Sequence, residues 1–418
     1  VTAYTYYDNG LVHTETDPNL NVTTYTDYDA YGNWTRKVDA AGIVWNMTYD
    51  ERSRLIESSD SMGHHKQIFY DDLDNIVRTV EYTGTASPDV EYTHTYYPDG
   101  KKHTQTDGLG HTTEFSYDAL GRLVRQVETL NDAQGNPFSY EWTYVISPAS
   151  RTKTETNPRG VSKVTLFDEL VRTLSETVQG PYGPQQVIAR YTYDACGNRI
   201  IETSHAGAVT RYAYDGLYRL SRKTLPISSP GSIYEEVKRF DAAGNLLSET
   251  DANGNLSVYA YDSLNRMTSK TDAVGNQITY VYDSNGNILE KTYVGRNLVT
   301  TSTYDPINRP LSSTQTFTDP LSGGTVQYTS TISYDNENHT KTLTDPEGKV
   351  VREVYDGLDR AVSRSVDPDG LNLVTMFGYD AGGNLTVTTD PAGRTAENTY
   401  DGLGRKLSTR YQPQGFEE

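Results

Sequence analysis

The sequence predicts an all-β protein in which tandem antiparallel hairpins form one long coiled β-sheet. Three observations lead to this class. A Tyr-Asp-x-x-Gly-Asn motif, as at residues 282–287, returns about every 21 residues along most of the chain. The residues before each motif alternate between two faces and are rich in β-branched and aromatic side chains, which is typical of a strand. Asp and Gly recur at the spacing of tight turns.

Residues 276–296 illustrate one repeat. Residues 277–282 alternate like a strand, and Asp-Ser-Asn-Gly at 283–286 then breaks the pattern. Asp suits the first position of a turn because its carboxylate accepts backbone N–H groups, and Gly suits the fourth because φ is often positive there. Residues 287–292 are the return strand. A second Asp-initiated turn, as in Thr-Asp-Ala-Asn-Gly at 250–254, closes the unit.

The repeated Tyr and Asp residues are the predicted structural sites of the array. Each Tyr ends a strand and each Asp starts the first turn, and degenerate copies begin at Tyr97, Phe167 and Phe240. The clear pairs that we single out are Tyr28 and Asp29, Tyr49 and Asp50, Tyr70 and Asp71, Tyr117 and Asp118, Tyr193 and Asp194, Tyr214 and Asp215, Tyr261 and Asp262, Tyr282 and Asp283, Tyr304 and Asp305, Tyr334 and Asp335, Tyr355 and Asp356, Tyr379 and Asp380, and Tyr400 and Asp401.

The two kinds of turn differ along the chain. The fifth position of the first turn alternates between Asn and a basic residue, as at Asn245 and Arg266. We hypothesise that each Arg pairs with an Asp of the adjacent turn; a solvated rim produced by duplication is the alternative. The second turns vary in length, so binding would be sought on their rim, with tolerated insertion as the alternative. The long second turns are residues 83–88, 131–139, 179–185, 226–233 and 318–325.

The composition excludes several classes of protein. The net charge of −19 argues against binding to nucleic acids or anionic membranes, since both are polyanions. No apolar stretch is long enough to span a bilayer as a helix. Apolar residues make up 35% of the chain, and 34 Tyr supply much of that share. We therefore expect a sheet held by rows of Tyr contacts between hairpins, without a thick core.

The repeat also bounds the geometry. About 18 repeats of two strands give a sheet about 170 Å wide and about 25 Å tall. A sheet of that width has to curl, because strands twist and open sheets rarely pass about 10 strands without curling. We expect residues 1–418 to form one continuous array with no second domain, as a piece of a longer protein.

No motif for chemistry emerges from the sequence. The Asp-rich turns 251–255 and 283–287 lack the closing Glu of a calcium loop. The eight His show no metal-ligand spacing, and His64 and His65 would point to opposite faces of a strand. Cys196 lies in a turn without a His neighbour. We therefore predict no catalytic, cofactor-binding or metal-ligating residue, and no enzyme activity.

The repeated motif resembles that of the YD-repeat (Rhs) family, for example at residues 117–123 and 400–407. The resemblance implies a hollow β-sheet shell like those of bacterial Rhs toxins and toxin-complex subunits; teneurin adhesion receptors carry the same repeats. Residues 367–371, Asp-Pro-Asp-Gly-Leu, are similar to the core segment of a self-cleaving aspartyl protease in toxin-bearing relatives. Two further units follow here, at Tyr379 and Tyr400, so the family's catalytic residues are not carried over.

Two functions fit this resemblance. The first is the wall of a shell that encapsulates a polymorphic toxin in a secreted Rhs-type protein, with the rest of the parent chain (core segment and toxin cargo) as its partner. The alternative is an extracellular structural or adhesive stalk or fibre, with a cell-surface or self partner. Both imply a secreted or cell-surface bacterial protein without cofactor or nucleic acid.

Overall fold

The computed structural model describes residues 1–131, 136–226, 234–319 and 321–412. They form one antiparallel sheet of 36 strands, which confirms the predicted class. Each strand pairs with the strands before and after it in the chain, so the sheet is an uninterrupted meander. Within these ranges there is no helix that could cross a membrane.

The strands are short and evenly spaced. In chain order they are β1 (Ala3–Tyr6), β2 (Val12–Thr16), β3 (Val22–Tyr28), β4 (Trp34–Val38), β5 (Val44–Tyr49), β6 (Leu55–Asp60), β7 (His65–Tyr70), β8 (Ile76–Tyr82), β9 (Val90–Tyr96), β10 (Lys102–Thr106), β11 (Thr112–Tyr117), β12 (Leu123–Asn131), β13 (Pro137–Ser147), β14 (Thr152–Thr156), β15 (Ser162–Phe167), β16 (Thr173–Gln179), β17 (Gln186–Tyr193), β18 (Arg199–Ser204), β19 (Val209–Tyr214), β20 (Leu220–Leu225), β21 (Tyr234–Phe240), β22 (Leu246–Thr250), β23 (Leu256–Tyr261), β24 (Met267–Thr271), β25 (Gln277–Tyr282), β26 (Ile288–Tyr293), β27 (Leu298–Tyr304), β28 (Pro310–Thr318), β29 (Thr325–Asp335), β30 (Thr340–Thr344), β31 (Val350–Tyr355), β32 (Ala361–Val366), β33 (Leu373–Tyr379), β34 (Leu385–Thr389), β35 (Thr395–Tyr400) and β36 (Lys406–Gln412).

The hairpin at 277–293 has the turn chemistry that the sequence predicts. The Asp283 N–H donates to the Asn287 carbonyl at 3.0 Å, and the Asn287 N–H donates to the Asp283 carboxylate at 2.8 Å. The Asn287 side-chain amide donates to the second carboxylate oxygen at 2.7 Å. Gly286 has a φ of 98°, where only glycine is unstrained. The turn is therefore closed by its own Asp.

The strand-ending Tyr joins one hairpin to the previous one. The Tyr282 hydroxyl donates to the backbone carbonyl of Met267, where the preceding return strand begins, at 2.7 Å. The same bond recurs from Tyr400 to the carbonyl of Leu385 at 2.8 Å. Phenylalanine could fill the space but could not make this bond. The hydroxyl therefore gives a physical reason for Tyr at this position.

Replacing Tyr282 with Phe is expected to lower the free energy of unfolding by about 1 kcal/mol, the usual net value of one hydrogen bond. Urea denaturation followed by circular dichroism measures the change. Tyr182→Phe is the matched control, because Tyr182 is fully exposed in a loop. Equal losses in the two variants would mean that the hydroxyl bond does not stabilise the array.

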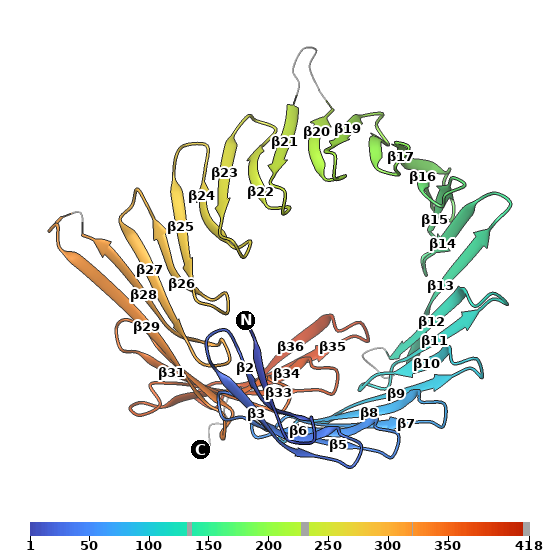
Figure 1. The fold of residues 1–418 in the computed structure, drawn as a ribbon. Helices are drawn as coiled ribbons and strands as arrows, with labels where there is room; N and C mark the ends of the chain where they lie inside the picture. The colour runs from blue at the N-terminus through green and yellow to red at the C-terminus, as the bar shows by residue number, and fades with distance from the viewer. Residues whose placement is uncertain (132–135, 227–233, 320, 413–418) are drawn as a thin grey trace.

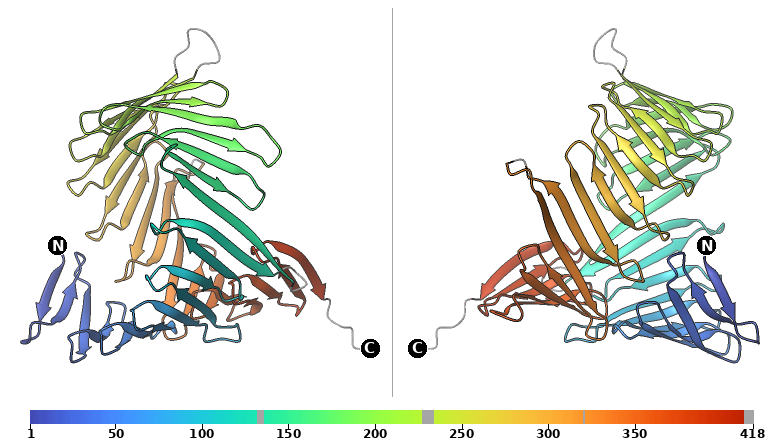
Figure 2. Two further views of the ribbon diagram at one scale, coloured as in Figure 1. Left: turned by 90° about the vertical axis from the view of Figure 1, so that its right-hand side faces the viewer. Right: turned by 60° about the vertical axis from the view of Figure 1, so that its left-hand side comes forward.

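The sheet winds into a ring whose two ends overlap (Figure 1). Figure 2 shows from two further sides that the N-terminal strands (blue) and the C-terminal strands (red) are both at the bottom of the ring, toward opposite sides of the view. Contacts confirm the overlap: the Gly357 N–H donates to the Thr83 carbonyl at 2.8 Å, and the Asn285 amide donates to the Asp17 carboxylate at 2.7 Å. The chain has therefore completed one turn of a coil and begun a second, stacked against the first.

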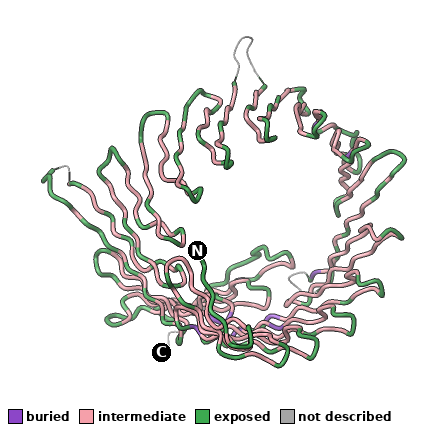
Figure 3. Tube along the Cα trace, in the orientation of Figure 1, coloured by how far each residue is buried: buried purple, intermediate pink, exposed green. Residues whose placement is uncertain are grey.

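The best-buried residues lie where the two turns of the coil stack. Most of the sheet is half-buried or exposed, as expected for a single layer (Figure 3). The largest fully buried side chains are Ile43, Thr83, Leu130 and Asp356, all at or next to hairpin tips in the overlap. Within the described ranges the fold thus has no thick core, and burial concentrates along one line of contact.

Candidate functional site: the seam between turns of the coil

We call this line of contact the seam. Second turns of early hairpins meet first turns of hairpins that follow 264 to 295 residues later in the chain. Reciprocal amide–carboxylate bonds start it: Asn19 donates to Asp283 at 2.8 Å, and Asn285 donates to Asp17 at 2.7 Å. The early side consists of turns 17–21, 39–43, 60–64, 83–89 and 107–111, together with Leu130 and Asn131 at the end of β12. The later turns are residues 283–287, 335–339, 356–360, 380–384 and 401–405.

Glycines allow the two turns of the coil to approach closely. A Cβ at Gly357 would lie 2.5 Å from the Tyr82 carbonyl oxygen and 2.7 Å from that of Gly63. A Cβ at Gly402, in the same position of its own turn, would lie 2.6 Å from the Cβ of Leu130. Any side chain at these two positions would have to push the turns apart.

Arginine side chains stabilise several of the later turns. We call the bond from the fifth residue of a turn to the carboxylate of its first residue the clamp. Arg360 donates from Nε to the Asp356 carboxylate at 2.8 Å, and the Asp356 side chain has no exposed surface. The Arg360 guanidinium lies 4.7 Å above the Tyr379 ring of the next hairpin and donates to the Asp380 carbonyl at 3.4 Å. The clamp therefore fixes its own turn and the hairpin that follows.

The predicted bond from Arg to an Asp of the adjacent turn is present in several copies, mostly through the Asp backbone carbonyl. The ion pair is mainly with the Asp of the same turn, and the adjacent turn supplies a backbone carbonyl and an aromatic ring. Arg266 shows the pattern, with the Asp262 carboxylate at 2.8 Å and the Tyr282 ring at 4.8 Å. Arg54 adds a bond to the side chain of Asp74 in the adjacent turn. A planar guanidinium serves both roles because it can stack and donate at once.

The turn carboxylates are stabilised in their charged form. Hydrogen bonds from the side chain four residues later hold the pKa of Asp215 (from Arg219) and of Asp194 (from Asn198) below the ordinary value. The same cause lowers the pKa of further turn carboxylates in both kinds of turn. These are Asp29, Asp50, Asp71, Asp241, Asp251, Asp272, Asp390 and Asp401.

The array is therefore expected to lose stability in acid. A carboxyl group whose pKa is depressed by folding contributes stability above its unfolded pKa, near 3.9 for Asp, and loses it as the pH falls through the lower folded pKa. Urea denaturation between pH 7 and pH 2 should give a constant free energy of unfolding down to about pH 5 and a steep fall below about pH 4. An unfolding free energy that does not fall in that range would contradict the role of the turn carboxylates.

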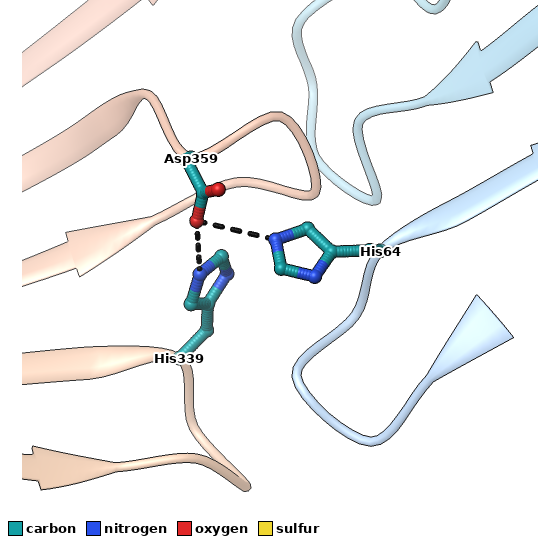
Figure 4. A group of neighbouring side chains, drawn as sticks. All are labelled: His64, His339 and Asp359. Atoms are coloured by element: carbon teal, nitrogen blue, oxygen red, sulfur yellow. Dashed lines mark hydrogen bonds and ion pairs between the residues drawn. The ribbon is translucent and has the colours of Figure 1, made fainter. Parts of the chain in front are cut away.

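A group of three side chains spans the seam (Figure 4). His64 lies at the end of the second turn 60–64, His339 ends the first turn 335–339, and Asp359 lies in the first turn 356–360. The Nε2 atoms of His64 and His339 lie 3.1 Å and 3.0 Å from the same Asp359 oxygen. The two rings meet edge to face, with centroids 5.1 Å apart.

The charge of His64 is set by its two carboxylates. Its Nδ1 lies 2.6 Å from Asp60, and its Nε2 faces Asp359. The hydrogen bond with Asp60, assisted by Asp359 and opposed by burial, raises the pKa of His64 to about 9. His64 therefore contacts carboxylates from both turns of the coil.

The spacing of the His residues along the chain did not indicate this group, and the prediction that no residue ligates a metal remains a prediction. His64, His339 and Asp359 have donor atoms within 4.8 Å of one another. His339 and Asp359 lie in adjacent hairpins. His64 precedes Asp359 by 295 residues, and the winding of the coil brings it beside them. His64 and His65 were predicted not to share a site. The Nε2 atom of His65 lies 2.7 Å from the Glu57 carboxylate, separate from the His64 group.

Three other features singled out in the sequence are Cys196, residues 367–371 and the segment 226–233. Cys196 is exposed in a first turn, with its N–H on Asp194 at 2.9 Å and its sulfur 3.7 Å from the Tyr218 hydroxyl. Residues 367–371 form the second turn between β32 and β33, as predicted. The segment 226–233 lies almost wholly outside the described residues.

The predicted Tyr and Asp residues divide between the seam and the rest of the sheet. Of the predicted Tyr and Asp sites, the first residues of the five later turns belong to the seam: Asp283, Asp335, Asp356, Asp380 and Asp401. It places others, such as Tyr193 and Asp194, in hairpins whose recorded contacts run along the sheet. The long second turn 83–88 reaches the seam, and so does Asn131 at the start of the turn 131–139, whose residues 132–135 lie outside the described residues. Part of the variable rim therefore contacts the chain itself.

A single meandering sheet, built from one repeated hairpin and wound into a coil, defines the class of repeat scaffolds. Within that class, residues 96–137, 240–277 and 355–395 match the RHS repeat family. The chain therefore carries RHS repeats, and the predicted resemblance to the YD-repeat (Rhs) family is confirmed. A search of curated protein sequences found no match.

Solved structures share the fold. A crystal structure of TcdB2-TccC3-TEV matches with a TM-score of 0.72 and 16% identity, over 98% of this chain and 24% of that one. The structure of a Photorhabdus luminescens Tc holotoxin pore matches with a TM-score of 0.71 and 16% identity, over 98% and 24%. A crystal structure of TcdB2-TccC3 without its hypervariable C-terminal region matches with a TM-score of 0.59 and 14% identity, over 99% of this chain and 27% of that one. The chain thus spans about a quarter of the length of the chains it matches.

Proposed function

We propose that the chain is part of the wall of a β-sheet shell that encapsulates a toxin in a secreted Rhs-type protein. The observation that carries the proposal is the seam, because a container needs successive turns of its wall to stay joined. The seam joins them through a backbone bond at Gly357, side-chain amides at Asn19 and Asn285, and buried side chains such as Leu130. The likeness of fold to chains of solved toxin complexes supports it.

The proposed role is structural. The carboxylates of the turns accept bonds from their own backbone and from Asn or Arg side chains, which uses them for folding. The partners would be the remaining parts of a longer parent chain, including a toxin cargo. Tyr and Asp of each repeat act in this proposal as hairpin joints, and residues 1–418 act as one continuous array.

Limited proteolysis of the full-length parent chain tests the proposal. The cargo segment is expected to resist protease in the native protein and to be digested once the seam is opened by Gly357→Ala combined with Gly402→Ala. Gly216→Ala is the control, because Gly216 has the same place in its turn and open space around it. A cargo segment that is digested equally fast in all three proteins would refute encapsulation.

A further inference from the structure

Three donor atoms converge at the seam from three different hairpin tips. They are Nε2 of His64, a ring nitrogen of His339 and a carboxylate oxygen of Asp359, all within 4.8 Å of one another. His64 belongs to the first turn of the coil, and the other two belong to the second (Figure 4). Any ion held by all three would join segments 295 residues apart.

The ring of His64 is already oriented for such a role. Its Nδ1 is held by Asp60 at 2.6 Å, and the Asp60 side chain has no exposed surface, so Nε2 faces the seam. Histidines that bind metals characteristically use their second nitrogen in this way, with a carboxylate that fixes the ring. Asp60 would therefore act as the outer partner of the site.

His339 is free of the clamp that this turn position usually makes. In most first turns the fifth residue binds the carboxylate of its own Asp, as Asn287 does with Asp283. Here Asn338 takes that place and donates to Asp335 at 2.7 Å. The His339 side chain, 13% exposed, points its Nε2 to Asp359 instead.

We propose that His64, His339 and Asp359 bind a divalent transition-metal ion of the zinc type, which ties adjacent turns of the coil together. Two imidazoles and a carboxylate suit zinc, whereas calcium and magnesium prefer oxygen ligands. The separations of 3.0 Å and 3.1 Å are close to the distance of about 3.3 Å between ligand atoms in a tetrahedral zinc site. Asp359 is 69% exposed, so water can complete the coordination.

Titration of the chelator-treated full chain with Co²⁺ tests the site, because tetrahedral Co²⁺ absorbs visible light strongly. One equivalent is expected to bind with a tetrahedral spectrum, and Zn²⁺ should displace it. His339→Asn and Asp359→Asn should each weaken binding at least tenfold. Both variants copy residues of other repeats: Asn287 ends its turn, and Asn265 occupies the position of Asp359 with a φ of 62°. They are therefore expected to fold, which circular dichroism checks.

His111→Asn is the matched control. His111 clamps Asp107 at the same place in a second turn, and Gly382 and Ala381 lie against that turn in place of further ligands. Its replacement should leave metal binding unchanged. X-ray absorption of the unmodified zinc-loaded protein should show two histidine ligands. No bound equivalent, an octahedral spectrum, or equal affinity in His339→Asn and the unmodified protein would overturn the proposal.

Discussion

Replacing Gly357 with alanine is expected to open the seam. The added Cβ would meet the carbonyl oxygens of Tyr82 and Gly63 at 2.5 Å and 2.7 Å, and both are backbone atoms that cannot rotate away. The shift would also stretch the bond from the Gly357 N–H to the Thr83 carbonyl. Overpacking of this kind costs about 1–3 kcal/mol. Small-angle scattering should show a larger radius of gyration than that of the unmodified chain.

The control for this experiment is Gly216→Ala. Gly216 follows Asp215 as Gly357 follows Asp356, but an added Cβ there meets no atom within 4 Å. We therefore expect no change in radius or stability. Gly402→Ala should act like Gly357→Ala, because its Cβ would lie 2.6 Å from that of Leu130. Equal radii of gyration and equal stabilities for Gly357→Ala and Gly216→Ala would contradict the close packing described for the seam.

Replacing Asp356 with alanine is expected to produce the largest loss of stability among the turn carboxylates. The Asp356 side chain has no exposed surface and accepts bonds from the Leu358 and Arg360 N–H groups and from Arg360 Nε. Its removal would leave the guanidinium of Arg360, 14% exposed, without its anion. Breaking a buried pair on one side costs about 3–5 kcal/mol. Urea denaturation measures the loss.

Two further variants separate the effect of burial at the seam from the effect of leaving an unpaired charge. Asp262→Ala removes the same clamp from a turn away from the seam, where the Asp side chain is 23% exposed, and should cost clearly less. Removing both charges, in Asp356→Ala combined with Arg360→Leu, should recover part of the loss because no unpaired charge remains. A single variant at Asp356 that is no worse than the one at Asp262 would show that burial at the seam does not strengthen the clamp.

Local features of the fold were predictable because each repeat specifies itself. The alternation over residues 277–282 and the Asp-Ser-Asn-Gly turn predict β25 and its hairpin, and the return strand begins one residue later than expected, at Ile288. The number of strands followed from the repeat count. Such patterns are readable because strand period and turn chemistry depend on neighbours in sequence.

The seam was not predictable in the same way. Whether Gly357 meets Thr83 depends on the small twist and bend that each hairpin adds, summed over many strands before the chain returns. If the accumulated twist and bend differed by the amount that one strand adds, different hairpin tips would meet. The grouping of His64 with His339 follows from the same sum, which is why the spacing of His residues along the chain gave no indication of it.

The partners of the Arg residues were predicted only in part, for a simpler reason. The alternation of Asn and Arg suggested a bond between turns, but Nε of Arg reaches the carboxylate four residues before it, as the Asn amide does in other copies. The extra length of Arg then carries the guanidinium over the next Tyr ring. Asn and Arg thus share one role, and Arg adds a second.

Small-angle X-ray scattering of the purified chain at several concentrations tests the central claim most directly. A sheet wound into a ring and joined to itself at the seam should give a pair-distance distribution weighted toward long distances, a form-factor minimum and no dependence on concentration. Gly357→Ala should weaken the minimum, whereas Gly216→Ala should not. A rod-like profile that lengthens with concentration would contradict a coiled wall and would favour a fibre of paired edges.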